Sequence, residues 1–244
     1  MALTLIYWPT LPGRGEYARL LLEALELPYR DLGRSNGVRA VLAQRGAVDP
    51  GPPGFAPPML IDDSTEPPRR VAQTAAVLQY IDDVYGPFGD PAIDRYAKLH
   101  LNLTLLDIVA EAHDTHHPID VSLTYEQQAD AALARARAFQ QNRIPRFLSL
   151  LEQTARDTGG DGLLGGLCVV DLVLAHTIRG LQYAFPAATA ATLRQTPRIA
   201  AITDAALAVP AVAAYRASDR FLAFDETGIF RHYAELQDPA FAAT

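Results

Sequence analysis

The pattern of hydrophobic and polar positions changes type several times along the first part of the chain. Leu3–Trp8 is a short run of strand-forming residues, and the breakers of PTLPGRG follow it. In the next segment, EYARLLLEALEL, the spacing of Ala18, Leu21 and Leu25 makes one apolar helical face. The chain is therefore predicted to open with a strand, a loop and a helix.

Three further strands and a helix are predicted before residue 86. Residues 27–32, 58–63 and 69–73 have strand composition, and the last two flank STEPP as a hairpin. Residues 33–54 are rich in Gly, Pro and polar residues, with one indication of a helical turn in VRAVLAQR. A helix follows, with Thr74 as its N-cap or first-turn residue. The predicted order is βαβ, an irregular segment and ββα.

After the breaker cluster GPFGDP the pattern is almost entirely helical. The helices are predicted at 92–117 (ended by Pro118), 125–160 (with a kink at Pro145), 169–185, 198–208 and 211–224. The predicted fold class is α/β followed by all-α. The expected domains are 1–85, and 92–244 with a C-terminal tail.

Composition narrows the class of protein. The 244 residues are 49% hydrophobic and 20% charged, which is ordinary for a soluble globular protein. A formal charge of −7 disfavours nucleic acid as a partner, because phosphate binding needs a basic surface. The single cysteine, Cys168, excludes an intramolecular disulfide and fits a reducing compartment. We expect neither a signal peptide nor a membrane span, and hence a cytoplasmic protein without a membrane partner.

Four segments match the motifs of a known family in the same order. A Tyr closes the strand in LIYWPTLPGRGEYARLLLE, PPMLID opens a strand with Pro-x-Leu, QTAAVLQYI begins a helix, and GLCVVDL precedes TPRIAAITDAALAVPAVAAYRASDR. Together, over Leu3 to about Arg220, they resemble the cytosolic glutathione transferases (glutathione S-transferases) of the tyrosine-type mu, pi and sigma classes. The resemblance implies a thioredoxin-like βαβ-ββα domain that binds glutathione and an all-helical second domain.

The resemblance implies that the Tyr7 hydroxyl stabilises the glutathione thiolate. A free thiol has a pKa near 8.5, and lowering it by about two units takes roughly 2.7 kcal/mol. One hydroxyl donor in a partly dry site supplies a good part of that free energy. A core or interface tyrosine is the alternative interpretation of Tyr7, and Thr10 is a rival donor. No cysteine lies in Tyr7–Gly15, which disfavours the thiol-bearing redox classes.

Glutathione also carries two carboxylates and an ammonium group, so its site needs charged and polar partners. Gln73 and Thr74 match the family pair that binds the γ-glutamyl carboxylate, and a helix N-terminus favours an anion. A simple N-cap is the other interpretation of this pair. By resemblance Arg14 also points into the site.

Further candidates lie at both ends of the tripeptide. The indole N–H of Trp8 would donate to the glycyl carboxylate, and Gln44 and Arg45 are candidates for the same end. Asp107 would reach the γ-glutamyl ammonium from a neighbouring subunit, or is a solvated residue on a helix face. No metal is expected as a cofactor, and glutathione would be a co-substrate.

Two consecutive prolines distinguish this chain from its relatives. Pro58 falls on the family's cis-proline, which turns the backbone of the preceding residue toward the cysteinyl group of glutathione. That preceding residue is Pro57, which has a C=O but no N–H, so half of the backbone pairing cannot form. Ala56 also lacks the side-chain amide often found there. We therefore expect glutathione to bind with one backbone bond or slightly displaced.

Other chemistry-bearing residues have structural interpretations. Cys168 takes the place of a helix N-cap, with Asp171 as the capping-box acid three residues later. His113 and His117 are four apart in HDTHHP, but they lack a clear third metal ligand, so capping, packing or lining of the acceptor pocket is favoured. The tail aromatics Phe221, Phe224 and Phe230 would cover a pocket or a dimer seam.

The first functional hypothesis is a glutathione transferase that conjugates glutathione to hydrophobic electrophiles. The acceptor pocket would include Trp8, Pro9, Leu11, Pro12, the His113–His117 region and the C-terminal tail. One alternative is a ligandin-like binding protein of the same fold with weak or no catalysis, which Ala56 and Pro57 favour. Another is a specialised glutathione-dependent isomerase, dehalogenase or prostaglandin synthase-like enzyme. The resemblance also implies a homodimer with a role in detoxification.

Overall fold

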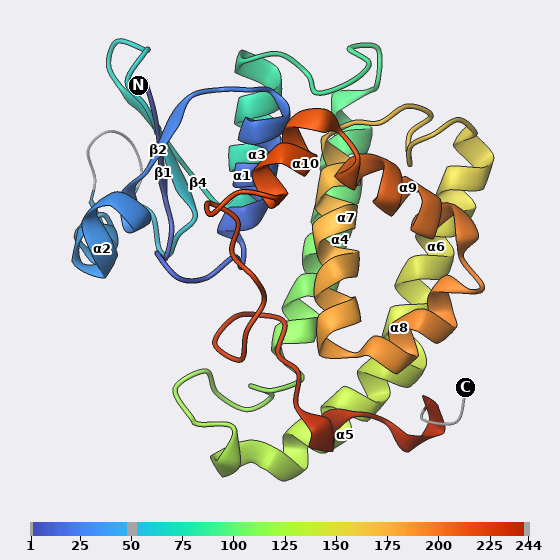
Figure 1. Ribbon diagram of the computed structural model, residues 1–244. Coiled ribbons are helices and arrows are strands. Elements are labelled where there is room, and N and C mark those ends of the chain that lie inside the picture. The colour runs from blue at the N-terminus through green and yellow to red at the C-terminus, as the bar shows by residue number, and fades with distance from the viewer. Residues whose placement is uncertain (1, 48–52, 242–244) are drawn as a thin grey trace. The chain divides into compact units, whose positions relative to one another are not determined.

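The computed structural model describes residues 2–47 and 53–241, which form two compact units (Figure 1). Unit 1 consists of the described residues up to Ala92 together with Ala208–Ala223. Unit 2 consists of Ile93–Leu207 and the described residues from Phe224 onward. The observed units thus differ from the predicted domains in the segment Ala208–Ala223, and the predicted boundaries stay a prediction.

Unit 1 contains a four-stranded sheet in the order β2-β1-β3-β4. The strands are β1 (Leu3–Ile6), β2 (Tyr29–Asp31), β3 (Met59–Asp62) and β4 (Arg69–Ala72). β1 pairs parallel with β2 and antiparallel with β3, and β3 pairs antiparallel with β4. The register sets Ile6 opposite Met59, and Met59 opposite Ala72.

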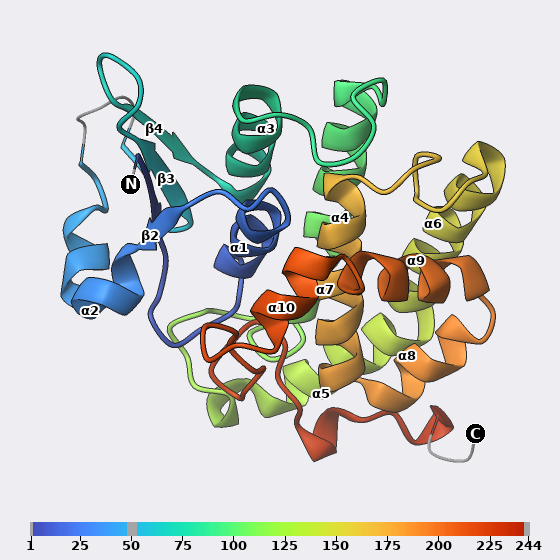
Figure 2. The ribbon, with the colours of Figure 1, turned by 45° about the horizontal axis from the view of Figure 1, so that its top comes forward.

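Helices cover both faces of this sheet, which explains why all four residues of β1 are buried (Figures 1 and 2). α1 (Gly15–Ala24) and α3 (Thr74–Val84) pack together on one face, and α2 (Leu32–Ala43) lies on the other. α10 (Pro210–Arg216) packs against α1. The apolar faces of the two central helices are fully buried at Leu20, Leu21, Val77, Leu78 and Ile81.

Unit 2 is helical in the residues that the structure describes, with α7 packed against α4, α8 and α9 (Figure 2). Its α-helices are α4 (Arg95–His113), α5 (Ala129–Ala138), α6 (Ile144–Thr158), α7 (Val169–Ala184), α8 (Pro186–Leu193) and α9 (Pro197–Leu207). A π-turn at Phe139–Arg143 separates α5 from α6, and short 3₁₀ turns lie at Glu126–Gln128, Ala234–Leu236 and Pro239–Phe241. The predicted fold class, a βαβ-ββα domain and an all-helical one, is confirmed.

Several predicted boundaries were wrong, for local reasons. Residues 33–43 were predicted to be irregular apart from one helical turn, but they belong to α2. The helical geometry of α2 breaks only at Gly37, with φ 79°. The helix predicted to reach residue 117 ends at His113, where the Thr115 hydroxyl donates to the Ala112 carbonyl at 2.7 Å. The helix predicted for 211–224 ends at Arg216, where the Ser218 hydroxyl donates to the Tyr215 carbonyl at 2.7 Å.

The predicted capping box at the start of α7 is confirmed. The Cys168 N–H donates to Asp171 Oδ2 at 2.7 Å, and the Leu163 N–H donates to Oδ1 at 2.9 Å. Cys168 is fully buried, and burial raises the pKa of its thiol, so it is an unreactive core residue.

Among the described residues, no single helix is both long enough and apolar enough to span a membrane. The consecutive helices Pro197–Leu207 and Pro210–Arg216 reach that length and hydropathy only when taken together.

Candidate functional site

One end of the sheet gathers three of the predicted site residues. Tyr7 follows Ile6 at the end of β1, Pro58 precedes Met59 at the start of β3, and Gln73 follows Ala72 at the end of β4. Because Ile6, Met59 and Ala72 are paired across the sheet, their neighbours emerge at the same edge. We call this edge, with the adjoining N-termini of α1 and α3, the sheet-edge site.

Tyr7 is held by the loop between β1 and α1. Its side chain is 4% exposed, and two glycines of the loop lie against it. A Cβ on Gly13 would come 2.3 Å from Tyr7 Oη, and a Cβ on Gly15 would come 2.3 Å from Tyr7 Cγ. Only glycine at these two positions lets the backbone approach the ring this closely.

The hydroxyl of Tyr7 is available to donate a hydrogen bond. It accepts a hydrogen bond of 2.8 Å from the N–H of Arg14, and no described residue accepts the hydroxyl proton. Burial raises the pKa of Tyr7 above 10, although the Arg14 N–H and the Arg19 charge act in the opposite direction. Tyr7 is therefore a neutral phenol at physiological pH, able to donate to an anionic sulfur.

Sequence reasoning missed the buried ion network behind Tyr7. The Arg19 guanidinium lies 5.6 Å from the centroid of the Tyr7 ring. Its Nη1 donates to Glu16 at 3.0 Å, its Nε donates to Asp31 at 2.8 Å, and Glu16 also accepts from Tyr215 at 2.8 Å. A charged pair three residues apart in the apolar run of α1 was the signal that could have indicated this network.

The predicted cis peptide bond is present between Pro57 and Pro58, and a second one lies between Glu66 and Pro67. Both prolines at the start of β3 are buried. At this position Pro57 offers a carbonyl and no N–H, as expected from its chemistry.

The N-terminus of α3 has unsatisfied polar groups. Gln73 has a φ of 75°, an unusual conformation for a residue other than glycine, and its side chain does not cap the helix. Thr74 is 2% exposed, and its Oγ1 hydrogen-bonds to no described residue. A buried hydroxyl without a partner beside free helix N–H groups fits a carboxylate ligand.

The remaining candidates differ in availability. The Gln44 backbone carbonyl and side-chain carbonyl both accept from Arg70 at 3.1 Å, which leaves its side-chain NH₂ as the donor. The Arg45 Nε donates to the Phe55 carbonyl at 3.3 Å. Trp8 is partly exposed and packs on the cluster around Met59.

Two candidates face solvent within their own units. The rival donor Thr10 is exposed in the β1–α1 loop of unit 1. Asp107 is exposed on α4 of unit 2, so its predicted action from a neighbouring subunit stays a prediction.

The histidine cluster in unit 2 holds the C-terminal segment. The rings of His113, His116 and His117 lie 4.8–5.2 Å apart, and His116 Nε2 hydrogen-bonds the Ile229 carbonyl at 2.8 Å. Burial lowers the pKa of His116 to about 3. Among residues 2–47 and 53–241, no three His, Cys, Asp or Glu side chains are placed to hold a metal ion.

The tail aromatics pack within their units. In unit 2 Phe224 stacks on His176 at 5.1 Å, and Phe230 is buried against Gly180, where a Cβ would come 2.3 Å from its ring. In unit 1 Phe221 meets the edge of Tyr215 at 5.8 Å.

Comparisons with known proteins agree with the fold. Residues 113–219 match the family model described as glutathione S-transferase, C-terminal domain. No curated protein sequence matches the chain.

Similar solved structures include a pi-class glutathione S-transferase of Onchocerca volvulus, prostaglandin synthase D of Nilaparvata lugens and a glutathione S-transferase from Ascaris lumbricoides. Their identities to this chain are 15%, 15% and 18%, with TM-scores of 0.62, 0.63 and 0.63. The matches cover 88%, 90% and 91% of this chain, and 92%, 98% and 100% of the other chains. The chain therefore has the fold of these solved structures, two of which are glutathione S-transferases, and its residues 113–219 match the C-terminal domain of that family.

Proposed function

We propose that this protein is a glutathione transferase of the tyrosine type. The observation that carries the proposal is the Tyr7 hydroxyl, which accepts from the Arg14 N–H and keeps its own proton for a ligand. The unpartnered Thr74 hydroxyl supports a carboxylate at the same edge of the sheet. The fold and the C-terminal family match support the same class.

The sheet-edge site would act mainly by hydrogen bonding and charge. Tyr7 donates to the sulfur and so favours the thiolate, whose proton passes to water. The thiolate then forms a C–S bond with an electrophilic carbon of a hydrophobic acceptor, and the electron pair leaves with a departing group or takes up a proton. Gln73, Thr74 and Arg14 would hold the γ-glutamyl end, and Pro57 would offer its carbonyl to the cysteinyl N–H.

The remaining polar candidates would complete the tripeptide site. Trp8, Arg45 and the side-chain NH₂ of Gln44 would donate to the glycyl carboxylate. Asp107 of a second protomer would pair with the γ-glutamyl ammonium. The acceptor would lie beside Trp8 and the loop that follows it.

Replacing Tyr7 by Phe tests this assignment. Because one preorganised donor to an anion is worth about 2.7 kcal/mol or more, Tyr7→Phe should lower kcat/KM at pH 7 by about a hundredfold. The midpoint of the pH–rate profile should move to higher pH, because the thiolate loses its donor. Thr10→Ala is the matched control and should leave the profile unchanged. A wild-type profile in Tyr7→Phe would contradict the assignment.

A second candidate function is glutathione binding without general conjugation. Pro57 favours it, since half of the backbone pairing with the cysteinyl group cannot form. A thermal-shift measurement with glutathione, followed by an assay with a generic electrophile, separates the candidates. A shift with turnover supports the transferase, and a shift without turnover supports a carrier or a specialised isomerase, dehalogenase or prostaglandin synthase-like enzyme. The absence of any shift supports a carrier for other ligands.

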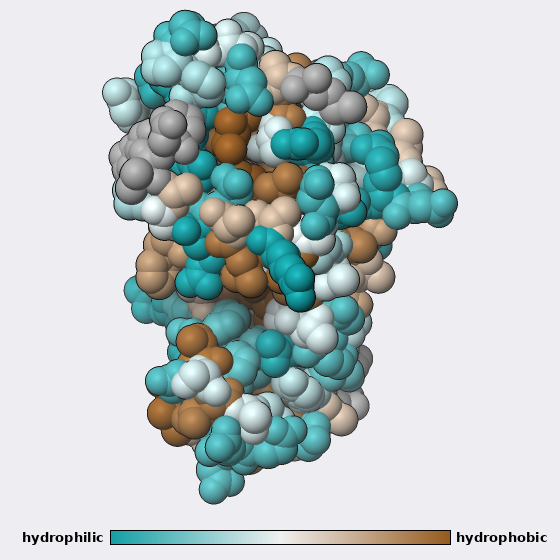
Figure 3. Space-filling view, turned by 90° about the vertical axis from the view of Figure 1, so that its left-hand side faces the viewer, coloured by the Kyte–Doolittle hydropathy of each residue, from teal (hydrophilic) through white to brown (hydrophobic). Residues whose placement is uncertain are grey.

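We further propose a cytoplasmic homodimer that acts in detoxification. Support for self-association comes from exposed apolar side chains of unit 1. The face of the molecule drawn in Figure 3 has several brown, hydrophobic areas between hydrophilic ones. Phe55 is 85% exposed, Val38 47% and Leu42 45%. Covering such side chains with a second molecule would remove apolar surface from water and so favour association.

A further inference from the structure

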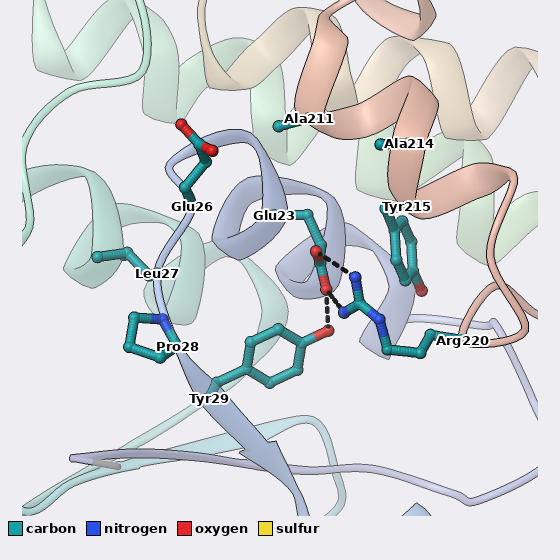
Figure 4. Close-up of a pocket in the computed structure, with 9 residues that line it drawn as sticks. All are labelled: Glu23, Glu26, Leu27, Pro28, Tyr29, Ala211, Ala214, Tyr215 and Arg220. Atoms are coloured by element: carbon teal, nitrogen blue, oxygen red, sulfur yellow. Dashed lines mark hydrogen bonds and ion pairs between the residues drawn. The ribbon is translucent and has the colours of Figure 1, made fainter.

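A cavity lies within unit 1, away from the sheet-edge site. Its volume is about 440 Å³, and none of the predicted glutathione-binding residues lines it. Its walls come from the end of α1, the loop to β2, α10 and the chain after α10 (Figure 4). The chemistry of the cavity resides in Glu23, Glu26, Tyr29, Tyr215 and Arg220.

Glu23 is the main charge-binding group of this cavity. Its side chain is only 13% exposed, and its Oε1 accepts from the Tyr29 hydroxyl at 2.9 Å. Both Glu23 oxygens also accept from the guanidinium of Arg220, with an Nη2–Oε2 distance of 2.9 Å (Figure 4). A largely buried carboxylate with two oxygens toward one planar cation is a fork-to-fork arrangement.

Arg220 behaves here as an internal ligand. Its guanidinium lies 5.2 Å from the centroid of the Tyr215 ring, so the pocket meets a cation with both a carboxylate and an aromatic face. The Arg220 side chain is nevertheless 57% exposed, and it comes from the irregular chain after α10. A group held on one side and open to solvent on the other can exchange with a free cation of the same shape.

The charge balance of the cavity favours a cation over an anion as its ligand. Glu23 and Glu26 carry two negative charges, and Arg220 supplies one positive charge. Glu26 is exposed, points away from Glu23 in Figure 4, and forms no ion pair with any described residue. An anion that entered the cavity would be repelled by both carboxylates, which disfavours it.

We propose that this cavity binds a planar organic cation, an amidinium or guanidinium group on a small apolar body, which takes the place of Arg220 on Glu23. The apolar body would lie against Leu27, Ala211 and Ala214, which line the same cavity. The volume is in the range of small-molecule sites. This site is independent of the proposed glutathione chemistry.

Calorimetric titration with benzamidine at low salt tests the site. Arg220→Ala removes the internal competitor and should bind benzamidine about tenfold tighter than the wild type. Adding Glu23→Gln to Arg220→Ala should abolish the gain, because the carboxylate is lost while the side-chain size is kept. Arg30→Ala, an exposed arginine of unit 1 outside the cavity, is the matched control and should bind as the wild type does.

Two analogues of benzamidine test whether the site requires a positive charge on the ligand. Benzamide, a neutral analogue, and benzoate, an anion, should both fail to bind Arg220→Ala. The proposal is overturned if Arg220→Ala binds benzamidine no better than Arg30→Ala, or if benzamide binds equally well. The glutathione thermal shift, measured on the same variants, is expected to stay at its wild-type value, so failure of one proposal is distinguishable from failure of the other.

Discussion

At the residue scale, the position of Tyr7 depends on the absence of a side chain at Gly15. A Cβ there would come 2.3 Å from Tyr7 Cγ, and Gly15 has ordinary helical geometry, so space is the only obstacle. Gly15→Ala should therefore displace the ring and lower the free energy of unfolding by about 1–3 kcal/mol, the usual cost of overpacking.

Urea unfolding of Gly15→Ala measures this cost. Gly166→Ala is the matched control, because no atom lies within 4 Å of the Cβ it would add. It should change stability little. Equal stability of the two variants would show that the loop around Tyr7 accommodates the added methyl group without cost, which would contradict the prediction.

Pro57 offers a second test at the same scale, which rests on the proposed function. Pro57→Val restores an N–H at the start of β3, where one more hydrogen bond with glutathione becomes possible. A net hydrogen bond is worth about 0.5–1.5 kcal/mol, so glutathione should bind roughly two- to tenfold tighter. Titration calorimetry measures the affinity. Pro91→Val, at an exposed turn, is the control. No gain in Pro57→Val would mean that the missing donor is not a handicap.

The sequence could predict some of these residues but not others. Tyr7, Pro58 and Thr74 belong to local motifs with a fixed spacing along the chain. The network of Glu16, Arg19 and Tyr215 joins residues as far as 199 positions apart, so no window of sequence contains it. The bond from Arg70 to Gln44 spans 26 positions, which also exceeds a local motif.

At the element scale, hydrophobic periodicity predicted the strands and the main helices but not their interruptions. α8 begins at the proline of PAATAATL, and the short, alanine-rich segment has too little polar contrast to show a face. The π-turn between α5 and α6 replaces the single predicted helix. Within it, Gln140 donates to the Leu236 carbonyl at 2.7 Å and accepts from the Asp238 N–H at 3.1 Å. The turn is thus fixed by the C-terminal segment, which local sequence cannot indicate.

The histidine cluster, which contacts the C-terminal segment, makes the stability of the fold depend on pH. Burial lowers the pKa values of His113, His116 and His117 below the ordinary value of 6.5. A histidine with a depressed pKa binds a proton more weakly when folded than when unfolded. Its full contribution to stability is therefore present above about pH 6.5 and is lost as the pH falls below that value. Asp114 opposes this for His113, whereas Arg231 reinforces it for all three histidines.

We predict that His116→Gln depends less on pH than the wild type. The glutamine amide can still donate to the Ile229 carbonyl, but it does not titrate. Urea midpoints at pH 7.5 and pH 5 should differ less in His116→Gln than in the wild type. His100→Gln, at an exposed position on α4, should behave as the wild type does. An unchanged difference in His116→Gln would assign the acid sensitivity to other groups.

At the scale of the whole molecule, the two structural units do not follow the order of the sequence, because unit 1 is built from two separate stretches of the chain. Residues Ala208–Ala223 follow the helices of unit 2 in sequence but belong to unit 1, where α10 packs on α1. The bonds of Tyr215 to Glu16 and of Arg220 to Glu23 hold this segment. Truncation of the chain after residue 92 would therefore remove part of unit 1, since the segment Ala208–Ala223 supplies polar partners of α1.

The proposed homodimer is the last property of the whole molecule that can be tested. Among the described residues of unit 1, Phe55 is the most exposed large apolar side chain, at 85%, and burying such a ring contributes about 1.5–3 kcal/mol to association. Phe55→Ser should therefore weaken the dimer roughly tenfold or more, as measured by sedimentation equilibrium. Ile119→Ser replaces a residue of unit 2 that is 65% exposed and serves as the control, with no change expected. A dimer as strong in Phe55→Ser as in the wild type would place the interface elsewhere, and a monomeric wild type would remove the neighbouring subunit from which Asp107 is proposed to act.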